Sequence, residues 1–528
     1  MNTKHLKAKI LDLAIRGKLV PQDPSEGNAA DLLKKIREEK SILIEQKKIK
    51  ADKNSSFIIK AEDGRHYEQF ANGSLIDIED DIPFEIPENW CWCRLREITT
   101  ILGDGLHGTP KYNKNGDYYF INGNNLENGK IIIKSDTQKV DDAEYQKYKK
   151  ELNDNTVLVS INGTIGNIAF YNNEKIILGK SACYFNLISP SFKNFIYLLI
   201  KTSFFLVYAT TNATGSTIKN VSLDTMRNFL LPLPPLSEQQ KIVSAIEKAF
   251  EQIDIIEKNK LNLKTYIKQT KSKILDLAIH GKLVEQNPSE GNAFELLEKI
   301  RKEKSELIKQ KKIKEDKNSS FIIKAEDGKH YERFIDGTLK DIEEEIPFKI
   351  PENWSWCRLP EICLKISDGT HKTPAYVDSG IPFLSVQNIS KGYFDLSNIK
   401  YITQEEHERL CQRIRPQKDD ILICRIGTLG KAIRNTLEFE FSLFVSLGII
   451  RIISSEMVDY VIATINSNYG LNWINENKVQ GSHTNKINLE TFPKLYIPLP
   501  PLAEQKRIVE RIGEIFNQLN VLEKALGE

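Results

Sequence analysis

The stretch that decides the fold is residues 231–250, LPLPPLSEQQKIVSAIEKAF, which returns at residues 497–516 as IPLPPLAEQKRIVERIGEIF. A Pro-Pro pair blocks any helix before it, and Ser237 is a candidate N-cap. Alternating steps of four and three from Ile242 reach Gly281, and nine of these twelve positions are apolar. This spacing predicts a coiled-coil helix over residues 237–280 that ends at a glycine cap.

The second copy of this helix is shorter, because the chain ends. The same steps give six apolar residues there: Ile508, Ile512, Ile515, Leu519, Leu522 and Leu526. The N-terminal segment then supplies Leu6, Ile10, Leu13 and Gly17. We therefore predict two long antiparallel helices, one continuous over residues 237–280 and one assembled from residues 503–528 and 3–16.

The whole chain is a duplication. Four phrases recur 264 positions apart: KILDLAI-x-GKLV (9, 273), IPENW-x-WCRL (86, 350), DG-x-H-x-TP (104, 368) and GT-x-G (163, 427). Residues 53–70 match residues 317–334 at sixteen of eighteen positions, whereas residues 111–208 and 375–472 share little. The pattern favours a constant frame that meets a repeated partner and carries two inserts with separate targets. The alternative is that the two inserts are loops whose sequences drifted apart after the duplication.

These observations predict an α+β fold with pseudo-twofold duplication, in which two globular domains are separated by the two long helices. We place the boundaries as follows: a helical N-terminal region that pairs with the C-terminal helix (1–84), a first insert domain (85–235), a central region (236–348), a second insert domain (349–501) and the C-terminal helix (502–528). A further amphipathic helix is expected at residues 29–50 and 293–314. We expect the Lys-rich runs near residues 45–53 and 309–317 to be its solvated end rather than a DNA patch.

Composition limits the function classes. The 528 residues carry a net charge of only +2, which argues against a free-standing nucleic-acid binder but allows one that shares its affinity with a basic partner. No run of 18 apolar residues appears. Seven cysteines without disulfide-like spacing fit a reduced, cytoplasmic protein.

Candidate catalytic motifs are incomplete. The LGKS at residues 178–181 lacks the glycine that a phosphate loop needs at position 174, and the Pro-Ser-Glu phrases after Asp23 and Asn287 lack the second Pro and the aromatic of an amino-methyltransferase motif. We expect packed thiols, not a zinc site, from Cys91, Cys93, Cys183, Cys357 and Cys363. His107 and His371 are interpreted as turn or contact residues. We expect no catalytic residues, no metal and no cofactor bound by this chain.

The repeated phrases PLPPL-x-EQ, LDLAI-x-GKLV, IPENW-x-W-x-RL, DG-x-H-x-TP and GT-x-G resemble the specificity (S) subunit of type I restriction–modification enzymes, over essentially the whole chain. The resemblance implies two target-recognition domains that each read half of a bipartite, gapped double-stranded DNA site. It also implies two modification subunits that use S-adenosylmethionine, and restriction subunits that cut DNA with ATP and Mg²⁺. A protein-interaction scaffold without DNA readout is the alternative, and a self-contained methyltransferase or nuclease is disfavoured by the missing motifs.

Polar and basic residues in the Gly-punctuated loops are the candidates for DNA contact, because Asn and Gln pair with adenine, Arg and Lys with guanine, and other Lys with phosphate. In the first insert they are Thr109, Lys111, Tyr112, Asn122, Asn124, Lys180 and Lys219. In the second they are Lys372, Thr373, Tyr376, Gln387, Asn388, Arg425, Lys431 and Lys486.

Overall fold

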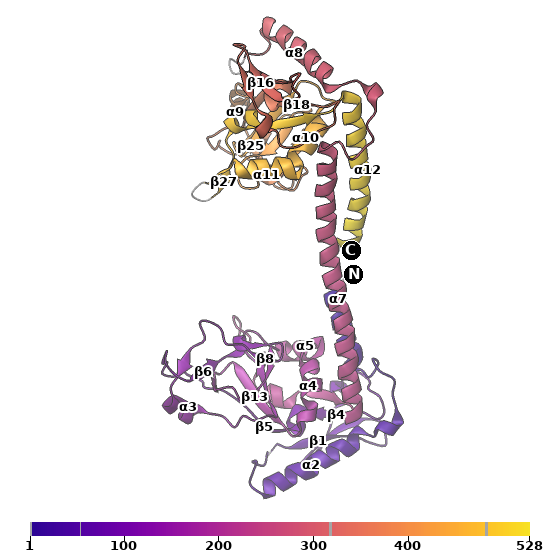
Figure 1. The fold of residues 1–528 in the computed structure, drawn as a ribbon. Coiled ribbons are helices and arrows are strands. Elements are labelled where there is room, and N and C mark those ends of the chain that lie inside the picture. Colours follow the sequence, from indigo (N-terminus) through magenta and orange to yellow (C-terminus); the bar gives the residue numbers. More distant parts are fainter. Residues whose placement is uncertain (1–2, 53, 316–318, 481–483, 528) are drawn as a thin grey trace. The chain divides into compact units, whose positions relative to one another are not determined.

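The computed structural model describes residues 3–52, 54–315, 319–480 and 484–527. The chain forms two compact units, Met1–Asn259 and Lys260–Glu528. The boundary falls inside α7 (Leu236–Ile279), one unbroken helix of 44 residues that contributes to both units (Figure 1). The predicted α+β class is confirmed.

In the first unit, α1 (Thr3–Ile15) runs antiparallel to the first part of α7. The Lys7 ammonium lies 2.5 Å from the Asp254 carboxylate and over the Phe250 ring, and Thr3 donates to Glu257. Rising residue numbers on α1 therefore meet falling numbers on α7. The N-terminal segment fills the place in this unit that the repeat predicts.

In the second unit, α12 (Leu502–Gly527) runs antiparallel to the last part of α7. Lys271 bonds to Glu523 and Asn520 at 2.7 Å, while Leu275 and Ala278 pack with Ile508 and Ile512. The antiparallel pairing is thus confirmed in each unit separately. Glu528, which the prediction included, lies outside the described residues.

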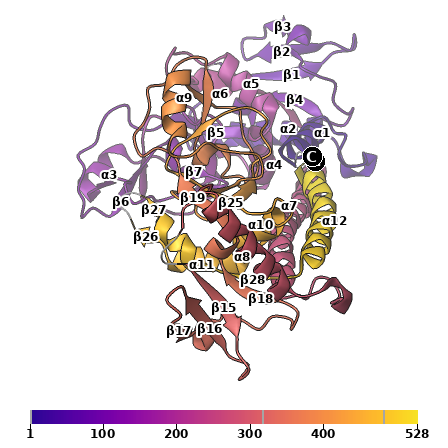
Figure 2. The ribbon, with the colours of Figure 1, turned by 90° about the horizontal axis from the view of Figure 1, so that it is seen from above.

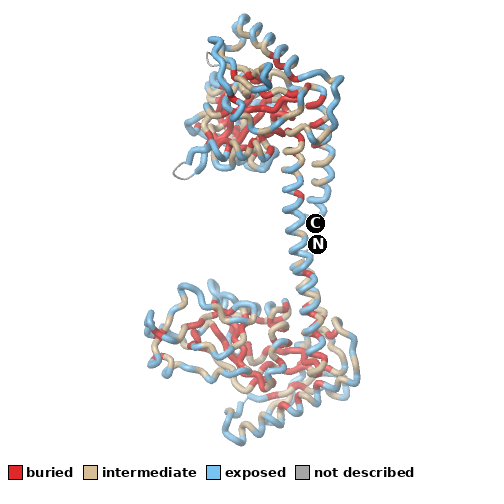
Figure 3. The backbone as a smooth tube through the Cα atoms, viewed as in Figure 1, coloured by how far each residue is buried: buried red, intermediate tan, exposed pale blue. Residues whose placement is uncertain are grey.

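The apolar seam of α7 is buried near its ends and exposed in its middle (Figure 3). Of the seam positions, Ile242, Ile246, Ile253 and Ile267 are buried, whereas Ile256 and Leu263 are exposed. Three apolar side chains beside the seam are exposed as well: Ile255, Leu261 and Tyr266. The seam prediction therefore holds where α1 or α12 covers the helix.

The glutamate of the repeated PLPPL-x-EQ phrase makes the same contacts at the start of α7 and of α12. Glu238 is buried and accepts bonds from Gln22 Nε2 (2.6 Å) and Asn89 Nδ2 (3.1 Å). Glu504 does the same with Gln286 (2.6 Å) and Asn353 (3.3 Å). In each unit, one carboxylate thus links three segments: the start of this helix, the turn after α1 or α7, and the segment that leads into the insert domain.

The N-cap prediction needs correction. The helix α7 begins at Leu236, so Ser237 lies in its first turn and donates instead to the carbonyl of Glu26. Gln239 Nε2 bonds back to the Pro234 carbonyl at 2.9 Å, and Gln505 to the Pro500 carbonyl likewise. The predicted glycine end is confirmed, since Gly281 has φ +66° and the Lys282 N–H bonds to the Leu277 carbonyl.

The second amphipathic helix is shorter than predicted. It spans Ala29–Glu45 (α2) and Ala293–Lys309 (α8), and ends because Lys47 and Lys311 adopt φ +56°. The Lys-rich runs therefore follow the helix rather than finish it. The region 1–84 is also not wholly helical, because it contains a three-stranded antiparallel sheet: β1 (Ser56–Lys60), β2 (His66–Phe70) and β3 (Leu75–Asp77). The second unit repeats it as β15 (Ser320–Lys324), β16 (His330–Phe334) and β17 (Leu339–Asp341).

The first insert enters on β4 (Cys91–Arg94) and leaves on β14 (Leu230–Leu233), which pair antiparallel. Between them lies a sheet of order β11-β10-β13-β5: Ile168–Phe170, Thr156–Ser160, Ala182–Leu187 and Thr99–Asp104. A second sheet has the order β12-β6-β9: Ile176–Leu178, Tyr118–Ile121 and Lys139–Val140. The helices are α3 (Asp142–Tyr148), α4 (Lys193–Ile200), α5 (Ser203–Thr211) and α6 (Leu223–Asn228).

The second insert repeats this plan between the paired strands β18 (Ser355–Arg358) and β28 (Tyr496–Leu499). Its sheets have the orders β19-β25-β22-β23 (Cys363–Asp368, Leu447–Ile452, Ile421–Cys424, Ala432–Arg434) and β21-β20-β24 (Lys400–Ile402, Ile381–Leu384, Ser442–Leu443). Its helices are α9 (Gln404–Cys411), α10 (Val458–Asn466) and α11 (Asn468–Glu476). The two inserts share a topology although their sequences have diverged.

Among the described helices, none alone has the length and apolar composition to cross a membrane; one bent pair, Pro190–Ile200 with Ser203–Thr211, passes by length and composition.

Candidate nucleic-acid interface

Four loops meet at one edge of the first insert domain. They follow the carboxyl ends of β5, β6, β10 and β12, and backbone bonds join them. The Leu106 N–H bonds to the Leu178 carbonyl (2.7 Å), and the Gly179 N–H to the Ile121 carbonyl (2.8 Å). The GT-x-G loop after β10 joins them through the Ile161 N–H, which bonds to the Ser181 carbonyl (3.0 Å), and its Gly163 N–H reaches the segment before α6 at the Lys219 carbonyl.

The second insert domain builds the same edge from the loops after β19, β20, β22 and β24. The Thr370 N–H bonds to the Leu443 carbonyl (2.9 Å), the Phe444 N–H to the Leu384 carbonyl (2.9 Å) and the Arg425 N–H to the Ser446 carbonyl (2.9 Å). Each insert thus presents one cluster of loops in the same order. We call each cluster a loop edge.

At each loop edge an amide side chain projects from a rigid turn. Asn124 lies in η4 (Gly123–Asn125) and Gln387 in η9 (Val386–Asn388), and both are exposed. A capping box closes each turn. Each turn is also held by a serine Oγ, through Ser181 to Gly123 N (2.9 Å) and Ser446 to Val386 N (3.1 Å). A fixed backbone with a free amide suits readout of a base edge.

The neighbouring Asn388 is correspondingly unavailable. It is buried, its Nδ2 donates to the Asp395 carbonyl (3.1 Å) and its Oδ1 accepts from Ser385 N (2.9 Å). Its structural counterpart in the first unit is Asn125, also buried. The sequence cannot distinguish the exposed amide of this pair from the buried one, because both lie in one short polar turn.

Arg425, a candidate for DNA contact, points inward. It is 6% exposed and its guanidinium is ion-paired with Asp368, which also pairs with Arg413. Burial would raise the pKa of the Asp368 carboxyl, but the bonds from Arg413 and Arg425 hold that pKa below its ordinary value. Arg425 therefore holds the DG-x-H loop in place and has no free donor side at the surface.

The two loop edges differ in the partners of the aspartate in the DG-x-H phrase. In the first unit Asp104 accepts from His107 Nε2 at 2.6 Å, and Ile161 stands where the second unit has Arg425. In the second unit His371 bonds to Asp368 at 3.1 Å. Each histidine thus bonds to the aspartate of its own turn, while most of its side chain stays exposed. The second edge thus contains a buried carboxylate–guanidinium pair where the first has an apolar side chain.

Most remaining candidates lie exposed at or beside the loop edges. The exposed ones are Thr109, Lys111, Tyr112, Lys180 and Lys219 in the first unit, and Lys372, Thr373, Tyr376 and Lys486 in the second. Asn122 and Lys431 are half-buried. Asn122 Oδ1 accepts from Ser181 Oγ (3.0 Å), so it supports the turn beneath Asn124.

Several residues of the edge were missed by the sequence argument. Arg409 and Arg413 line a cavity of about 330 Å³ beside Asp368, together with Thr370, His371 and Lys372. Both arginines come from α9 or its end, outside any repeated phrase, so no signal marked them. A weak sequence signal marked Ser181 and Ser446, since each directly precedes a buried strand.

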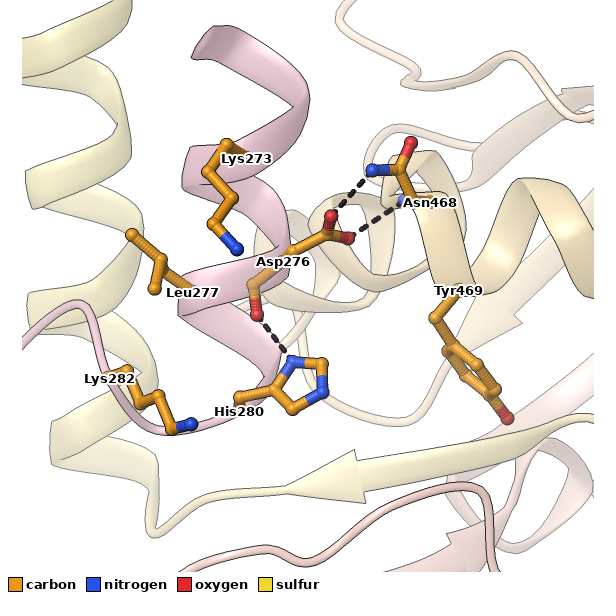
Figure 4. A pocket seen from close by; sticks show the side chains of 7 residues that line it. All are labelled: Lys273, Asp276, Leu277, His280, Lys282, Asn468 and Tyr469. Atoms are coloured by element: carbon orange, nitrogen blue, oxygen red, sulfur yellow. Dashed lines mark hydrogen bonds between the residues drawn. The ribbon is translucent and has the colours of Figure 1, made fainter. Parts of the chain in front are cut away.

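A second cavity, of about 310 Å³, lies where α7 meets α11 in the second unit (Figure 4). The Asp276 carboxylate accepts from the backbone N–H (3.0 Å) and Nδ2 (2.5 Å) of Asn468. None of the residues that line it belongs to the loop edge. This contact fastens the insert domain to the helix.

The structure also gives places to the cysteines and to the partial methyltransferase phrases. Over the described ranges, no group of three His, Cys, Asp or Glu side chains could hold a metal. Burial raises the pKa of Cys363 and of Cys424 to about 12, which keeps both as thiols. Asp23 and Asn287, which begin the partial methyltransferase phrases, cap short 3-10 turns instead.

The fold and the loop edges define a class of protein: a duplicated, two-domain chain whose halves present matching edges with different side chains. The sequence matches the family described as type I restriction modification DNA specificity domain over residues 87–265 and 351–528. The chain belongs to this family.

Relatives agree. The chain is similar to the specificity subunits of two Escherichia coli type I restriction enzymes: EcoEI (27% identity, 99% of this chain, 90% of the relative) and EcoAI (25%, 98% and 90%). A solved structure from a study of complex assembly and conformational transition in the type I R-M system covers 84% of this chain and 94% of its own, at 18% identity and a TM-score of 0.50. This likeness concerns the fold.

Proposed function

We propose that each insert domain reads one half of a bipartite DNA site through its loop edge, with Asn124 and Gln387 as the principal base-reading residues. The observation that carries the proposal is the matched pair of exposed amides on turns held identically in both units. A bidentate amide–adenine contact discriminates against a wrong base by about 1–3 kcal/mol.

The exposed lysines beside these turns would meet phosphate and fix orientation rather than sequence. Lys180 and Lys219 would do so in the first unit, and Lys372 and Lys486 in the second. We assign Asn122, Asn388 and Arg425 to holding the loops, and leave Thr109, Lys111, Tyr112, Thr373, Tyr376 and Lys431 as flanking contacts.

Catalysis would come from partner subunits. We infer that the duplicated frame docks two modification subunits, which use S-adenosylmethionine, and that restriction subunits using ATP and Mg²⁺ join the complex. The exposed apolar residues in the middle of α7 support docking on the helices. Because α7 belongs to both units, we infer that it sets the spacing of the half-sites.

The first test is a genome-wide adenine-methylation map of cells that express this chain with its modification subunit. We expect a single gapped two-part motif that is lost when this chain is omitted. A stable complex without any methylated motif would instead favour a scaffold role.

A further inference from the structure

The cavity of about 330 Å³ beside Asp368 lies at the second loop edge, between the DG-x-H loop, the strand β24 and the end of α9. Helix α9 is on the side of the second insert domain that faces away from α12 (Figure 2). Side chains that line the cavity are exposed, Arg413 by 53% and His371 by 63%. The cavity is therefore open to a ligand that approaches the loop edge.

One short segment connects this cavity with the turn that presents Gln387. Leu443, which lines the cavity, accepts a bond from the Thr370 N–H (2.9 Å), and the Val445 N–H bonds back to the Thr370 carbonyl (2.9 Å). The next residue, Ser446, holds the Gln387 turn through its Oγ. A group bound in the cavity and a base read by Gln387 would thus be held by the same hydrogen-bonded segment.

Positive charge exceeds negative charge in the cavity. The lining includes the cations Lys372, Arg409 and Arg413, and one carboxylate, Asp368. That carboxylate is 2% exposed and is ion-paired with both Arg413 and Arg425. An anion that enters the cavity would therefore meet cations, while the charge of the carboxylate is already compensated.

Asp368 also fixes the orientation of Arg413. The Arg413 Nη2 donates to the Asp368 carboxylate and its Nε to the Asp368 carbonyl (3.2 Å). Over the described residues, Arg413 Nη1 has no partner, so one donor side of an immobilised guanidinium stays available. Such a preorganised planar group suits the oxygens of a phosphate.

The two neighbouring cations also keep free donors. Arg409 is held by Glu406 through Nε (2.8 Å) and Nη2 (2.5 Å), which leaves its Nη1. No partner of the Lys372 ammonium is found in the part of the chain that the structure describes. The cavity thus offers donors from three cationic side chains, as a doubly liganded phosphodiester requires.

The first insert domain lacks these cations at the equivalent positions. Glu151 precedes Leu152 as Arg413 precedes Ile414, and the two apolar side chains pack against equivalent clusters. In the repeated DG-x-H phrase, Gly108 stands where the second unit has Lys372.

The first loop edge instead has cations where the second has none. Lys111 and Lys180 occupy the positions of Ala375 and Val445. The two edges therefore share a backbone plan but distribute positive charge differently.

We propose that this cavity binds a backbone phosphate of the half-site that the second insert domain reads, with Arg413 as the principal contact. Lys372 and Arg409 assist, and Asp368 is the positioning residue for Arg413. The inference rests on the proposed function and makes the two readers unlike in how they hold the DNA backbone. A free nucleotide has the same phosphate chemistry, but the link to the Gln387 turn favours DNA.

The test measures DNA binding by the chain in complex with its modification subunit, on duplexes that carry the methylated motif. Arg413→Gln and Lys372→Gln each remove a charge from the cavity. Arg415→Gln is the matched control, because Arg415 pairs with Glu408 and Glu440 and does not line the cavity. We expect each cavity variant to reduce the slope of log K against log salt concentration by about 0.9 and to weaken binding equally for correct and altered bases, whereas the control keeps the slope.

Ethylation of single phosphates locates the contact. In the unaltered complex, we expect ethylation of a phosphate in the second half-site to interfere with binding. Arg413→Gln should lose this interference and keep all interference in the first half-site. Lys372→Gln provides an independent variant if Arg413→Gln fails to fold, because the Lys372 ammonium has no partner among the described residues.

The other outcomes are separable. A salt slope and an ethylation pattern that both cavity variants leave unchanged would overturn the phosphate assignment, even if the motif is still read. Calorimetric titration with inorganic phosphate and ATP tests the other source: binding that Arg413→Gln abolishes, with an unchanged ethylation pattern, would show a free ligand and overturn the assignment to DNA. An unaltered complex that prefers no DNA sequence would overturn the proposed function itself.

Discussion

At the scale of single residues, the proposed reading of DNA rests on two amide side chains. Replacing Asn124 or Gln387 by Ala removes two hydrogen-bonding groups without touching the backbone that holds the turn. We expect each variant to lose roughly 10- to 100-fold in affinity for its own half-site and to accept other bases there, while the other half-site is read as before. Binding to DNA duplexes with one altered base per half-site measures this.

Asn388→Ala is the contrasting variant. Its side chain bonds to the backbone of Ser385 and of Asp395, so the expected loss is of stability and of all readout by the second unit, without a change in base preference. A relaxed preference in Asn388→Ala with unchanged stability would contradict the assignment of roles.

A buried carboxyl predicts a pH effect. Burial raises the pKa of Glu361 to about 7 against the opposing charge of Arg301. The folded state then holds this proton at a pH where the unfolded state has released it, so the associated stability is present below about pH 4.5 and is lost as pH rises to 7. Thermal unfolding should show a fall of roughly 1–3 kcal/mol between pH 5 and 8 that Glu361→Gln flattens. Glu332→Gln, whose carboxyl pKa lies below its ordinary value despite burial because of bonds from Arg358 and Ser320, should leave that fall in place.

At the scale of elements, the ends of helices proved harder to predict than the helices. The spacing of apolar residues gave α7 to within one residue at each end. The predicted end of α2, at residue 50, was wrong: the helix ends at Glu45, because Lys47 rather than a glycine adopts the left-handed conformation. The loop edges could be placed from Gly-punctuated phrases, but the inward turn of Arg425 could not, since its partner Asp368 is 57 residues away.

The glycine that ends α7 gives an element-scale prediction. Gly281 has φ +66°, and a Cβ there would lie 2.3 Å from the Pro351 ring. Gly281→Ala should therefore cost the left-handed penalty of about 1–2 kcal/mol and a further 1–3 kcal/mol of overpacking. Gly328→Ala, at φ +84° with open space around it, should cost the first amount only. Equal destabilisation of the two variants in chemical denaturation would contradict the role of Pro351.

At the scale of the whole molecule, the duplicated plan predicts that the two insert domains read DNA independently of each other. Each insert enters and leaves on adjacent paired strands, β4 with β14 and β18 with β28. We expect that replacing residues 98–230 by the corresponding insert of a relative changes one half of the methylated motif and leaves the other half and the gap unaltered. A change in both halves, or in neither, on a methylation map would contradict modular reading.

The paired entry and exit strands have a genetic consequence. Each insert follows a segment that is nearly identical in the two halves (residues 53–70 and 317–334) and is followed by the repeated PLPPL-x-EQ phrase. Recombination between two alleles, or between the halves of one gene, would therefore join at equivalent positions of the frame. Such crossovers would exchange whole readers as cassettes without disturbing the helices or the three-stranded sheets. A population carrying this gene would then acquire new DNA specificities by shuffling existing domains, faster than point mutation of individual loop residues would allow.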